Sequence, residues 1–250
     1  MDLKSYGSLA WTERIIVSGD ACANEVEQYV NAIKEHANRD LKTMLHLGCG
    51  AGGHDYYFKR HFEVTGVDIS GGMLNIAREA NPDVSYVQGD MRSISLEQKF
   101  DVVIIPDSIA YMSTHEDLKK AIHTVASHLC PGGIFLVVAH IKEEFINNNF
   151  AYSGTDGDIH ITVFENNHVI SESQYEATLV YLIRQSGVLQ VGYDVHTLGL
   201  FNYDTWLKFF SEAKLCVNAS FNMDELYDEF LLGEGEYRLK VFICSLEGTK

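Results

Sequence analysis

The sequence predicts an α/β fold: a doubly wound, mainly parallel sheet of seven strands that carries an inserted antiparallel, β-rich cap. Two observations support the sheet: five short apolar runs alternate with helical segments between residues 44 and 139, and a glycine cluster follows the first run. A third supports the cap, because the β-rich segments after residue 140 follow one another without intervening helices. Parallel neighbours need crossover connections, so the alternation predicts helices on both faces of the sheet.

The predicted core strands are short, mostly apolar runs, as expected for strands that are buried on both faces. They cover 44–47, 64–67, 84–87, 100–105 and 134–138, with helices over 21–42, 56–61, 72–80 and 118–129. The last of these helices ends before Cys130-Pro-Gly-Gly133, because proline and glycine interrupt helices.

The second half of the chain changes character. The β-rich segments 159–164, 169–175, 177–185 and 189–198 are separated by turn sequences such as Asn166-Asn167 and Ser186-Gly187, which predicts an antiparallel meander. A helix over 203–214 and strands over 217–221 and 237–246 complete the core sheet. We therefore divide the chain into an N-terminal helical lid (1–40), a core (41–140 and 201–250) and a β-rich cap (141–200).

Composition argues against several classes of function. The net charge is −16 at pH 7 and no run of Lys and Arg interrupts it, so a nucleic-acid partner is not expected. The five cysteines form no Cys-x-x-Cys pair or Cys/His cluster, which argues against a metal site and a disulfide framework. There is no signal-peptide pattern and no apolar run of about 20 residues. The sequence therefore predicts a cytoplasmic protein without a membrane partner.

The glycine cluster after the first strand is the centre of the functional argument. It reads His46-Leu-Gly48-Cys-Gly50-Ala-Gly52-Gly, and such glycines let a backbone turn sharply and approach a ligand closely. The pattern satisfies both Gly-x-Gly-x-Gly and the Gly-x-Gly-x-x-Gly of dinucleotide-binding proteins; a purely structural turn is the alternative. Asp68 ends the second strand 20 residues after Gly48, the offset at which a carboxylate accepts hydrogen bonds from ribose hydroxyls. Aspartate is also common in turns, but the joint occurrence favours a nucleoside ligand.

These residues resemble the class I S-adenosylmethionine-dependent methyltransferases. The matching segments are 47–52, 66–70 with Met73 and Leu74, 89–91, 100–102 and 129–133. The resemblance implies a Rossmann-like sheet that ends in an antiparallel hairpin, with S-adenosylmethionine as cofactor. Two alternatives remain open: a non-catalytic protein that binds this cofactor and, less favoured, an NAD-dependent oxidoreductase, which would need further parallel strands.

The resemblance also implies where the cofactor lies. The glycine loop contacts the methionine part, Asp68 binds ribose, Asp90 faces the adenine amino group, and the segment 106–108 lines the methionine end. His46 stands where the family usually has an acidic residue that organises the amino end of the cofactor. Tyr6, with Trp11, resembles a helix that closes over the cofactor, although an ordinary amphipathic helix is an equal alternative. The implied cofactor-binding residues are Tyr6, His46, Gly48, Cys49, Gly50, Gly52, Asp68, Ile69, Met73, Asp90, Met91, Pro106, Asp107 and Ser108.

A narrower resemblance links segments 107–111, the β-rich insertion and 196–201 to small-molecule methyltransferases such as the sugar N,N-dimethyltransferases of macrolide biosynthesis. In those enzymes the inserted sheet covers the active site, and it is also a candidate surface for a homodimer. The implied function is methyl transfer to a nitrogen or oxygen atom of a small-molecule acceptor. The sugar-modifying relatives place a histidine where this chain has Tyr111. That base is missing from the sequence, so the dimethylamino-sugar function is not carried over to this chain.

Methyl transfer is an in-line displacement from a sulfonium, so alignment and exclusion of water supply most of the rate. A base is needed only when the acceptor arrives protonated. Tyr111 and His140 follow the carboxyl ends of predicted strands, where ligands gather in open α/β sheets, and His196 lies on the inserted sheet. These three are the candidate catalytic residues. Aromatic packing is the alternative for Tyr111, and a structural histidine is the alternative for the other two.

Overall fold

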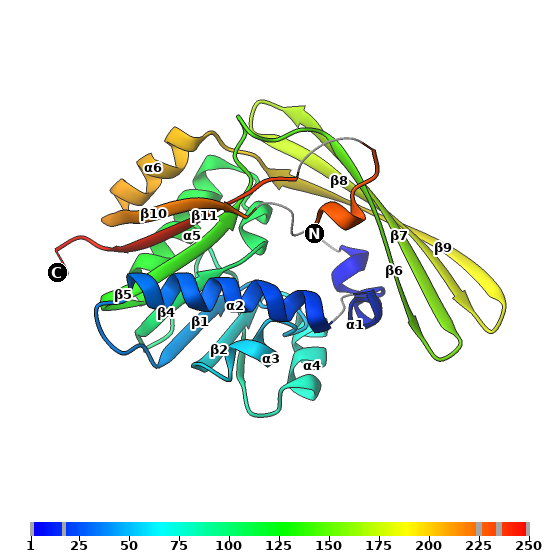
Figure 1. Cartoon of the computed structure of the whole chain (residues 1–250), viewed down its shortest axis with the longest axis horizontal. Helices are drawn as coiled ribbons and strands as arrows, with labels where there is room; N and C mark the ends of the chain where they lie inside the picture. The colour runs from blue at the N-terminus through cyan, green and yellow to red at the C-terminus, as the bar shows by residue number, and fades with distance from the viewer. Residues whose placement is uncertain (1–2, 17–18, 224–226, 234–236, 249–250) are drawn as a thin grey trace.

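The computed structural model of the 250-residue chain describes residues 3–16, 19–223, 227–233 and 237–248. Two sheets dominate it (Figure 1). The larger has seven strands in the order β10-β11-β5-β4-β1-β2-β3, and the smaller has four in the order β6-β7-β8-β9. In the larger sheet β11 runs antiparallel to both of its neighbours, β10 and β5, and the other neighbouring strands pair in parallel. The predicted doubly wound sheet with a closing antiparallel hairpin and an inserted antiparallel sheet is confirmed.

The strands of the larger sheet lie close to their predicted positions. They are β1 (Thr43–Leu47), β2 (Glu63–Asp68), β3 (Ser85–Gln88), β4 (Phe100–Ile105), β5 (Leu129–Ala139), β10 (Leu215–Met223) and β11 (Leu239–Leu246). The helices are α1 (Glu13–Ile16), α2 (Gly19–His36), α3 (Asp55–Phe58), α4 (Gly71–Ala80), α5 (His115–His128) and α6 (Tyr203–Glu212). Two predicted helices are shorter than expected: 21–42 ends at His36, and 56–61 is the single turn α3.

Alternation along the strands gives the larger sheet two cores. Met44 and Val102 belong to a cluster that α2 completes, whereas Leu45 and Val103 belong to a second cluster that α5 and α6 complete. In Figure 1, α2 crosses one face of the sheet. All four of these side chains are fully buried, as expected for parallel strands that are covered on both faces. This packing fixes the carboxyl ends of β1, β2 and β4, where the glycine loop, Asp68 and Asp107 follow.

The four-stranded sheet differs from its prediction at its first strand, which was not predicted, and at the boundary between its second and third strands. Its strands are β6 (Asn148–Asp156), β7 (Ile159–Ser171), β8 (Gln174–Gln185) and β9 (Val188–Gly199). The predicted break at Asn166-Asn167 is wrong: β7 runs through it, because both residues pair with β6 on one side and with β8 on the other. The side-chain amide of Asn167 also donates to Asn148 at 2.9 Å. The expected turn at Ser186-Gly187 is present, with positive φ at both residues, as in a type I′ hairpin.

The N-terminal segment divides between the two sheets. The 3₁₀ turns η1 (Lys4–Tyr6) and η2 (Ala10–Thr12), with α1, pack on the four-stranded sheet, whereas α2 covers the seven-stranded sheet. The approach of α1 is close, since a Cβ at Gly154 would lie 1.8 Å from the carbonyl oxygen of Ile15. In the described residues, no helix is long and apolar enough to cross a membrane.

Candidate active site

The glycine loop after β1 has a fixed conformation that only glycine accommodates easily. Gly48, Gly50 and Gly52 have φ values of +74°, +54° and +78°, in the left-handed region that other residues rarely adopt. A Cβ at Gly48 would lie 1.9 Å from Oγ of Ser108, which donates to the carbonyl of Leu47 at 3.0 Å. The loop is therefore packed tightly against the segment that follows β4, and both belong to the predicted cofactor site.

Asp68 supports this loop from the end of β2. Its Oδ2 accepts from the backbone N–H of Gly50 at 2.9 Å, and its Oδ1 accepts from that of Ser70 at 2.8 Å. The buried Met73 lies beneath the loop, with Cε 3.9 Å from a Cβ placed at Gly50. Ile69 is 64% exposed at the same edge. The structure thus gathers these predicted residues at one edge of the sheet, and their roles toward the cofactor stay predictions.

Other predicted cofactor residues flank the loop. Cys49 is buried, and burial raises the pKa of its thiol strongly. Met91 reaches within 3.1 Å of the Cβ position at Gly48, and Pro106 is buried at the end of β4. Both oxygens of Asp90 accept from the Arg92 guanidinium at 2.5–3.0 Å, and this partner holds the pKa of Asp90 below its ordinary value. An adenine contact by Asp90 would have to share that carboxylate with Arg92.

The structure does not place His46 with the groups that face the expected cofactor. Its ring is 1% exposed, and Nδ1 hydrogen-bonds to Oδ1 of the fully buried Asp55 at 2.7 Å. Strand alternation explains this, because His46 points to the α2 and α3 side of the sheet, where it packs against Phe58. Nε2 of His46 has no hydrogen-bond partner among the described residues. Its carboxylate partner Asp55 was missed in the sequence.

Three acidic side chains that the sequence did not single out surround the site. Glu13 lies on α1, with Oε1 3.8 Å from a Cβ placed at Gly50. Burial, and then proximity to Asp68 and Asp107, raise the pKa of Glu13 to about 7. Glu25 on α2 bonds to Nε2 of His54 at 2.5 Å and accepts from the hydroxyl of Tyr227. Burial lowers the pKa of His54, but Glu25 outweighs it, and the net pKa is raised. The third, Glu165, lies on β7.

The carboxyl group of Asp107 is affected by charged groups from both parts of the molecule, Glu25 on α2 and Glu165 on β7. Its side chain is exposed, yet burial by surrounding protein, followed by the charges of Glu25 and Glu165, raises its pKa to about 6. Glu13, Glu25 and Glu165 bring further carboxyl groups to this region. A site bordered by several carboxyl groups favours a cationic ligand.

Two of the three candidate catalytic residues are hydrogen-bonded to each other. The hydroxyl of Tyr111 lies 2.7 Å from Nδ1 of His196, and it also bonds to the hydroxyl of Tyr6. Nε2 of His196 lies 3.0 Å from Oδ2 of Asp194, a residue that the sequence did not identify. β9 thus places an imidazole beside the hydroxyl of Tyr111, and the catalytic roles of both residues stay predictions. Only the alternation of residues along β9 could have suggested that Asp194 and His196 share a face.

His140 lies apart from this hydrogen-bonded chain. Its Nε2 accepts from the hydroxyl of Tyr237 at 3.1 Å, and its ring packs edge-on against Phe145 and Tyr175. Burial lowers the pKa of His140 to about 4, so the imidazole is neutral near pH 7. These contacts fit the structural alternative for His140.

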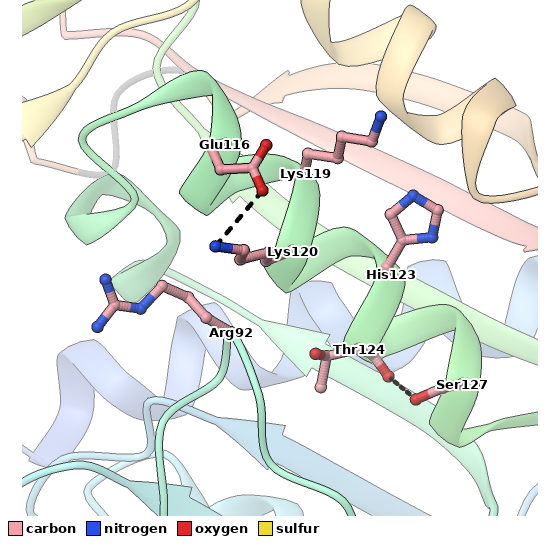
Figure 2. Close-up of a pocket in the computed structure, with 7 residues that line it drawn as sticks. All are labelled: Arg92, Glu116, Lys119, Lys120, His123, Thr124 and Ser127. Carbon is pink, nitrogen blue, oxygen red and sulfur yellow. Dashed lines mark hydrogen bonds and ion pairs between the residues drawn. The ribbon is translucent and has the colours of Figure 1, made fainter.

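A surface basin of about 370 Å³ lies on the outer side of α5 and is lined in part by Arg92, the partner of Asp90 (Figure 2). Its cationic side chains are paired: Lys120 with Glu116 at 3.4 Å, Lys119 with Glu212 at 2.7 Å, and Arg92 with Asp90 and Asp117. None of the predicted site residues lines it. The basin therefore does not compete with the site at the carboxyl edge of the sheet.

Comparison with known proteins points to one family. The sequence profile of the methyltransferase-domain family matches residues 44–133. The dTDP-3-amino-3,6-dideoxy-α-D-glucopyranose N,N-dimethyltransferase of Streptomyces fradiae is 30% identical over 192 residues, 74% of either chain. The dTDP-3-amino-3,4,6-trideoxy-α-D-glucopyranose N,N-dimethyltransferase of Streptomyces venezuelae is 37% identical over 100 residues, which span 39% of this chain and 42% of that protein.

The fold comparison covers nearly the whole chain. The crystal structure of Streptomyces venezuelae DesVI superposes with a TM-score of 0.78 at 23% sequence identity, covering 96% of both chains. The four-stranded sheet is thus part of a shared architecture, although the curated relative from Streptomyces venezuelae matches this chain over less than half of its own length.

Proposed function

Because the chain belongs to the class I S-adenosylmethionine-dependent methyltransferases, we propose that it methylates a nitrogen atom of a small, amine-bearing acceptor. The observation that carries the choice of nitrogen is the set of carboxyl groups at the site. Glu13 and Asp107 have raised pKa values because burial and neighbouring carboxylates disfavour their ionised forms. A cationic ligand relieves that repulsion, and both the sulfonium of the donor and an acceptor ammonium are cations.

The residues on the donor side fit S-adenosylmethionine. The residues of the glycine loop with positive φ carry no Cβ atoms, so the cofactor can approach the loop backbone closely. Asp68, at the end of β2, lies beside this loop. When bound, the cofactor supplies an electrophilic methyl group carried on a sulfonium. In this proposal Gly48, Gly50 and Asp68 bind it, and Asp107 with Ser108 lies near its methionine end.

The residues on the acceptor side come from the inner face of the four-stranded sheet. Glu165, Asp194 and His196 share that face, since β7–β8 and β8–β9 pairing brings Leu179 opposite both Glu165 and Asp194. In this proposal the four-stranded sheet covers the site, excludes water from the reacting atoms and orients the acceptor. The relatives named above act on amino sugars, and a hydrophilic amine of that size is the acceptor class that we propose here.

The experiment has a binding arm and a turnover arm. Calorimetric titration should detect binding of S-adenosylhomocysteine and should show no binding of NADH. Release of S-adenosylhomocysteine should then be measured with matched sugar nucleotides that carry an amino, a hydroxyl or a carboxyl group at one position. The proposal expects turnover of the amine. Binding of NADH alone, or turnover of only the hydroxyl or carboxyl compound, would overturn it.

We also propose a homodimer through the outer face of the four-stranded sheet. That face carries large apolar side chains that are open to solvent: Phe164 is 43% exposed, Val191 66% and Tyr193 60%. Phe164 and Val180 of this face also line a groove of about 250 Å³. Exposed apolar faces of this kind mark interaction surfaces. Analytical ultracentrifugation should give twice the chain mass, and Val191→Glu should give the monomer; a monomeric wild type would refute the dimer.

The five cysteines lie in the described part of the chain and are free thiols. Free thiols suit a reducing compartment, so we infer that the protein acts in the cytoplasm.

A further inference from the structure

Four side chains from three separated parts of the sequence form one hydrogen-bonded chain. Asp194 contacts His196 at 3.0 Å, His196 contacts Tyr111 at 2.7 Å, and Tyr111 contacts Tyr6 through their hydroxyl groups. Asp194 and His196 are 7% and 4% exposed, whereas Tyr111 and Tyr6 are only partly buried. The chain thus leads from the buried face of β9 toward the solvent-reachable side of the site.

The carboxylate of Asp194 determines which nitrogen of His196 carries a proton. Its Oδ2 accepts from Nε2 of His196, and a carboxylate can only accept. Burial by itself raises the pKa of Asp194, but hydrogen bonds from Ser5 and His196 outweigh it and hold the pKa below its ordinary value. With Nε2 protonated, Nδ1 of the neutral ring is an acceptor, and it faces the hydroxyl of Tyr111.

The same carboxylate also fixes the segment that carries Tyr6. Oδ2 of Asp194 accepts from the backbone N–H of Ser5 at 2.8 Å and from its hydroxyl at 2.9 Å. The hydroxyl of Ser5 lies 3.0 Å from that of Tyr181 on β8. Asp194 therefore holds the imidazole at one end of the chain and η1 at the other.

Resting on the proposed amine methylation, we propose that Asp194 positions a proton relay that frees the lone pair of the acceptor. The acceptor ammonium gives a proton to the oxygen of Tyr6. The proton of Tyr6 passes to the oxygen of Tyr111, and that of Tyr111 passes to Nδ1 of His196, where Asp194 stabilises the imidazolium. The free lone pair then forms the C–N bond while the C–S bond breaks and leaves its electron pair on sulfur. His196 returns its proton to solvent after product release.

The surroundings suit a relay of neutral hydroxyl groups. Burial raises the pKa of both Tyr6 and Tyr111 well above the ordinary value, so each hydroxyl accepts one proton as it gives up another and does not rest as a phenolate. Tyr175 and Asp107 are the other titratable groups that act on Tyr111. His140 is not a competing base, because it lies outside the chain and burial lowers its pKa to about 4.

Asp194→Asn is the central variant, because the amide keeps the shape of the side chain but allows the wrong tautomer of His196. Single-turnover rates should be measured at saturating S-adenosylmethionine with two amines of the same size. One is an amino sugar nucleotide, whose alkylamine is protonated at pH 7.5, and the other is the same sugar nucleotide with an alkoxyamine group, which is not. With the alkylamine, the rate should fall roughly 10–100-fold, the size expected for a misoriented base. With the alkoxyamine, which has no proton to lose before attack, it should fall less than about threefold.

Three further variants and one binding measurement separate the relay from a structural role. Asp156→Asn, an exposed aspartate at the end of β6, should leave both rates unchanged. Asp194→Glu should recover part of the alkylamine rate, and Tyr111→Phe should repeat the contrast between the two amines. Affinity for S-adenosylhomocysteine should change less than about threefold in Asp194→Asn, because no donor-side contact is lost.

The outcomes distinguish the relay from the function on which it rests. Failure of the wild type to methylate either amine would overturn the proposed function. If the wild type is active, equal losses for the two amines, or an unchanged alkylamine rate in Asp194→Asn, would overturn the relay.

Discussion

The two sides of the site are built differently. The donor side is a local structure: the glycine loop and Asp68 follow adjacent strands, and 20 residues separate Gly48 from Asp68. The acceptor side is assembled from η1, η3 (Ser108–Tyr111) and β9, which meet only in the folded chain. A donor site with fixed backbone geometry can therefore be kept while the acceptor side is changed one side chain at a time.

Two histidine–carboxylate pairs show the same contrast at closer range. His46 and Asp55 lie 2.7 Å apart within the core, and His196 and Asp194 lie 3.0 Å apart beside the site. The second nitrogen of His46 has no partner in the described structure, whereas that of His196 faces the hydroxyl of Tyr111. The two pairs thus differ in the group that the second imidazole nitrogen contacts. We therefore expect the His46–Asp55 pair to matter for stability and the His196–Asp194 pair to matter for turnover.

The largest effect is expected on the donor side, from Gly48→Val. A Cβ there would lie 1.9 Å from Oγ of Ser108, at a φ of +74° that a β-branched residue resists. Strain and displacement of the loop should cost about 3 kcal/mol, and binding of S-adenosylhomocysteine should weaken more than about 100-fold. Gly53→Ala is the matched control, because its Cβ would only contact Sγ of Cys22 at 3.5 Å. Normal binding by Gly48→Val would show that the loop tolerates displacement.

The next effect separates the two histidine pairs. His46→Leu leaves the carboxylate of Asp55 buried without its partner, so the free energy of unfolding should fall by about 3 kcal/mol in chemical denaturation. The double variant His46→Leu/Asp55→Leu should recover most of that loss, because it removes the uncompensated charge as well. Affinity for S-adenosylhomocysteine should stay within about threefold of wild type. A large loss of affinity in the folded His46→Leu protein would show that His46 contributes to cofactor binding.

A smaller effect concerns the charge of the site. The pKa values of Glu13 and Asp107 are raised to about 7 and about 6, so both carboxyls become ionised between pH 5.5 and pH 8. Raised acidic pKa values mean that the native state binds protons that the unfolded chain has released. The contribution of these two groups to stability therefore falls as the pH rises from about 3.8 to 7. The negative charges favour the cationic sulfonium of S-adenosylmethionine over the neutral thioether of S-adenosylhomocysteine.

The ratio of the two dissociation constants should therefore shift toward S-adenosylmethionine by roughly 3–10-fold between pH 5.5 and pH 8. Glu13→Gln should reduce this shift, and calorimetric titration with each compound measures it. A ratio that does not change with pH would mean that these carboxyls lie away from the sulfonium.

The same contrast explains what could be predicted from the sequence. Glycines with positive φ and an aspartate at a strand end leave a local pattern, so the core sheet and the donor loop were predictable. The acceptor side depends on Tyr6, Tyr111 and His196, whose contacts cross the interface between the two sheets. The pairing of His46 with Asp55 was also out of reach, because it depends on where the single turn α3 docks. The continuation of β7 through Asn167 likewise depends on pairing with the neighbouring strands.

The most direct test of this division compares Asp68→Ala with Asp194→Asn in single-turnover measurements on the protonated alkylamine, with S-adenosylmethionine raised until the rate no longer changes. Asp68→Ala should weaken cofactor binding by about 1.5–3 kcal/mol, yet reach the wild-type rate within about threefold at saturation. Asp194→Asn should saturate at the wild-type cofactor concentration and remain roughly 10–100-fold slower. A rate that saturating cofactor restores in Asp194→Asn, or fails to restore in Asp68→Ala, would contradict the separation of the donor and acceptor sides.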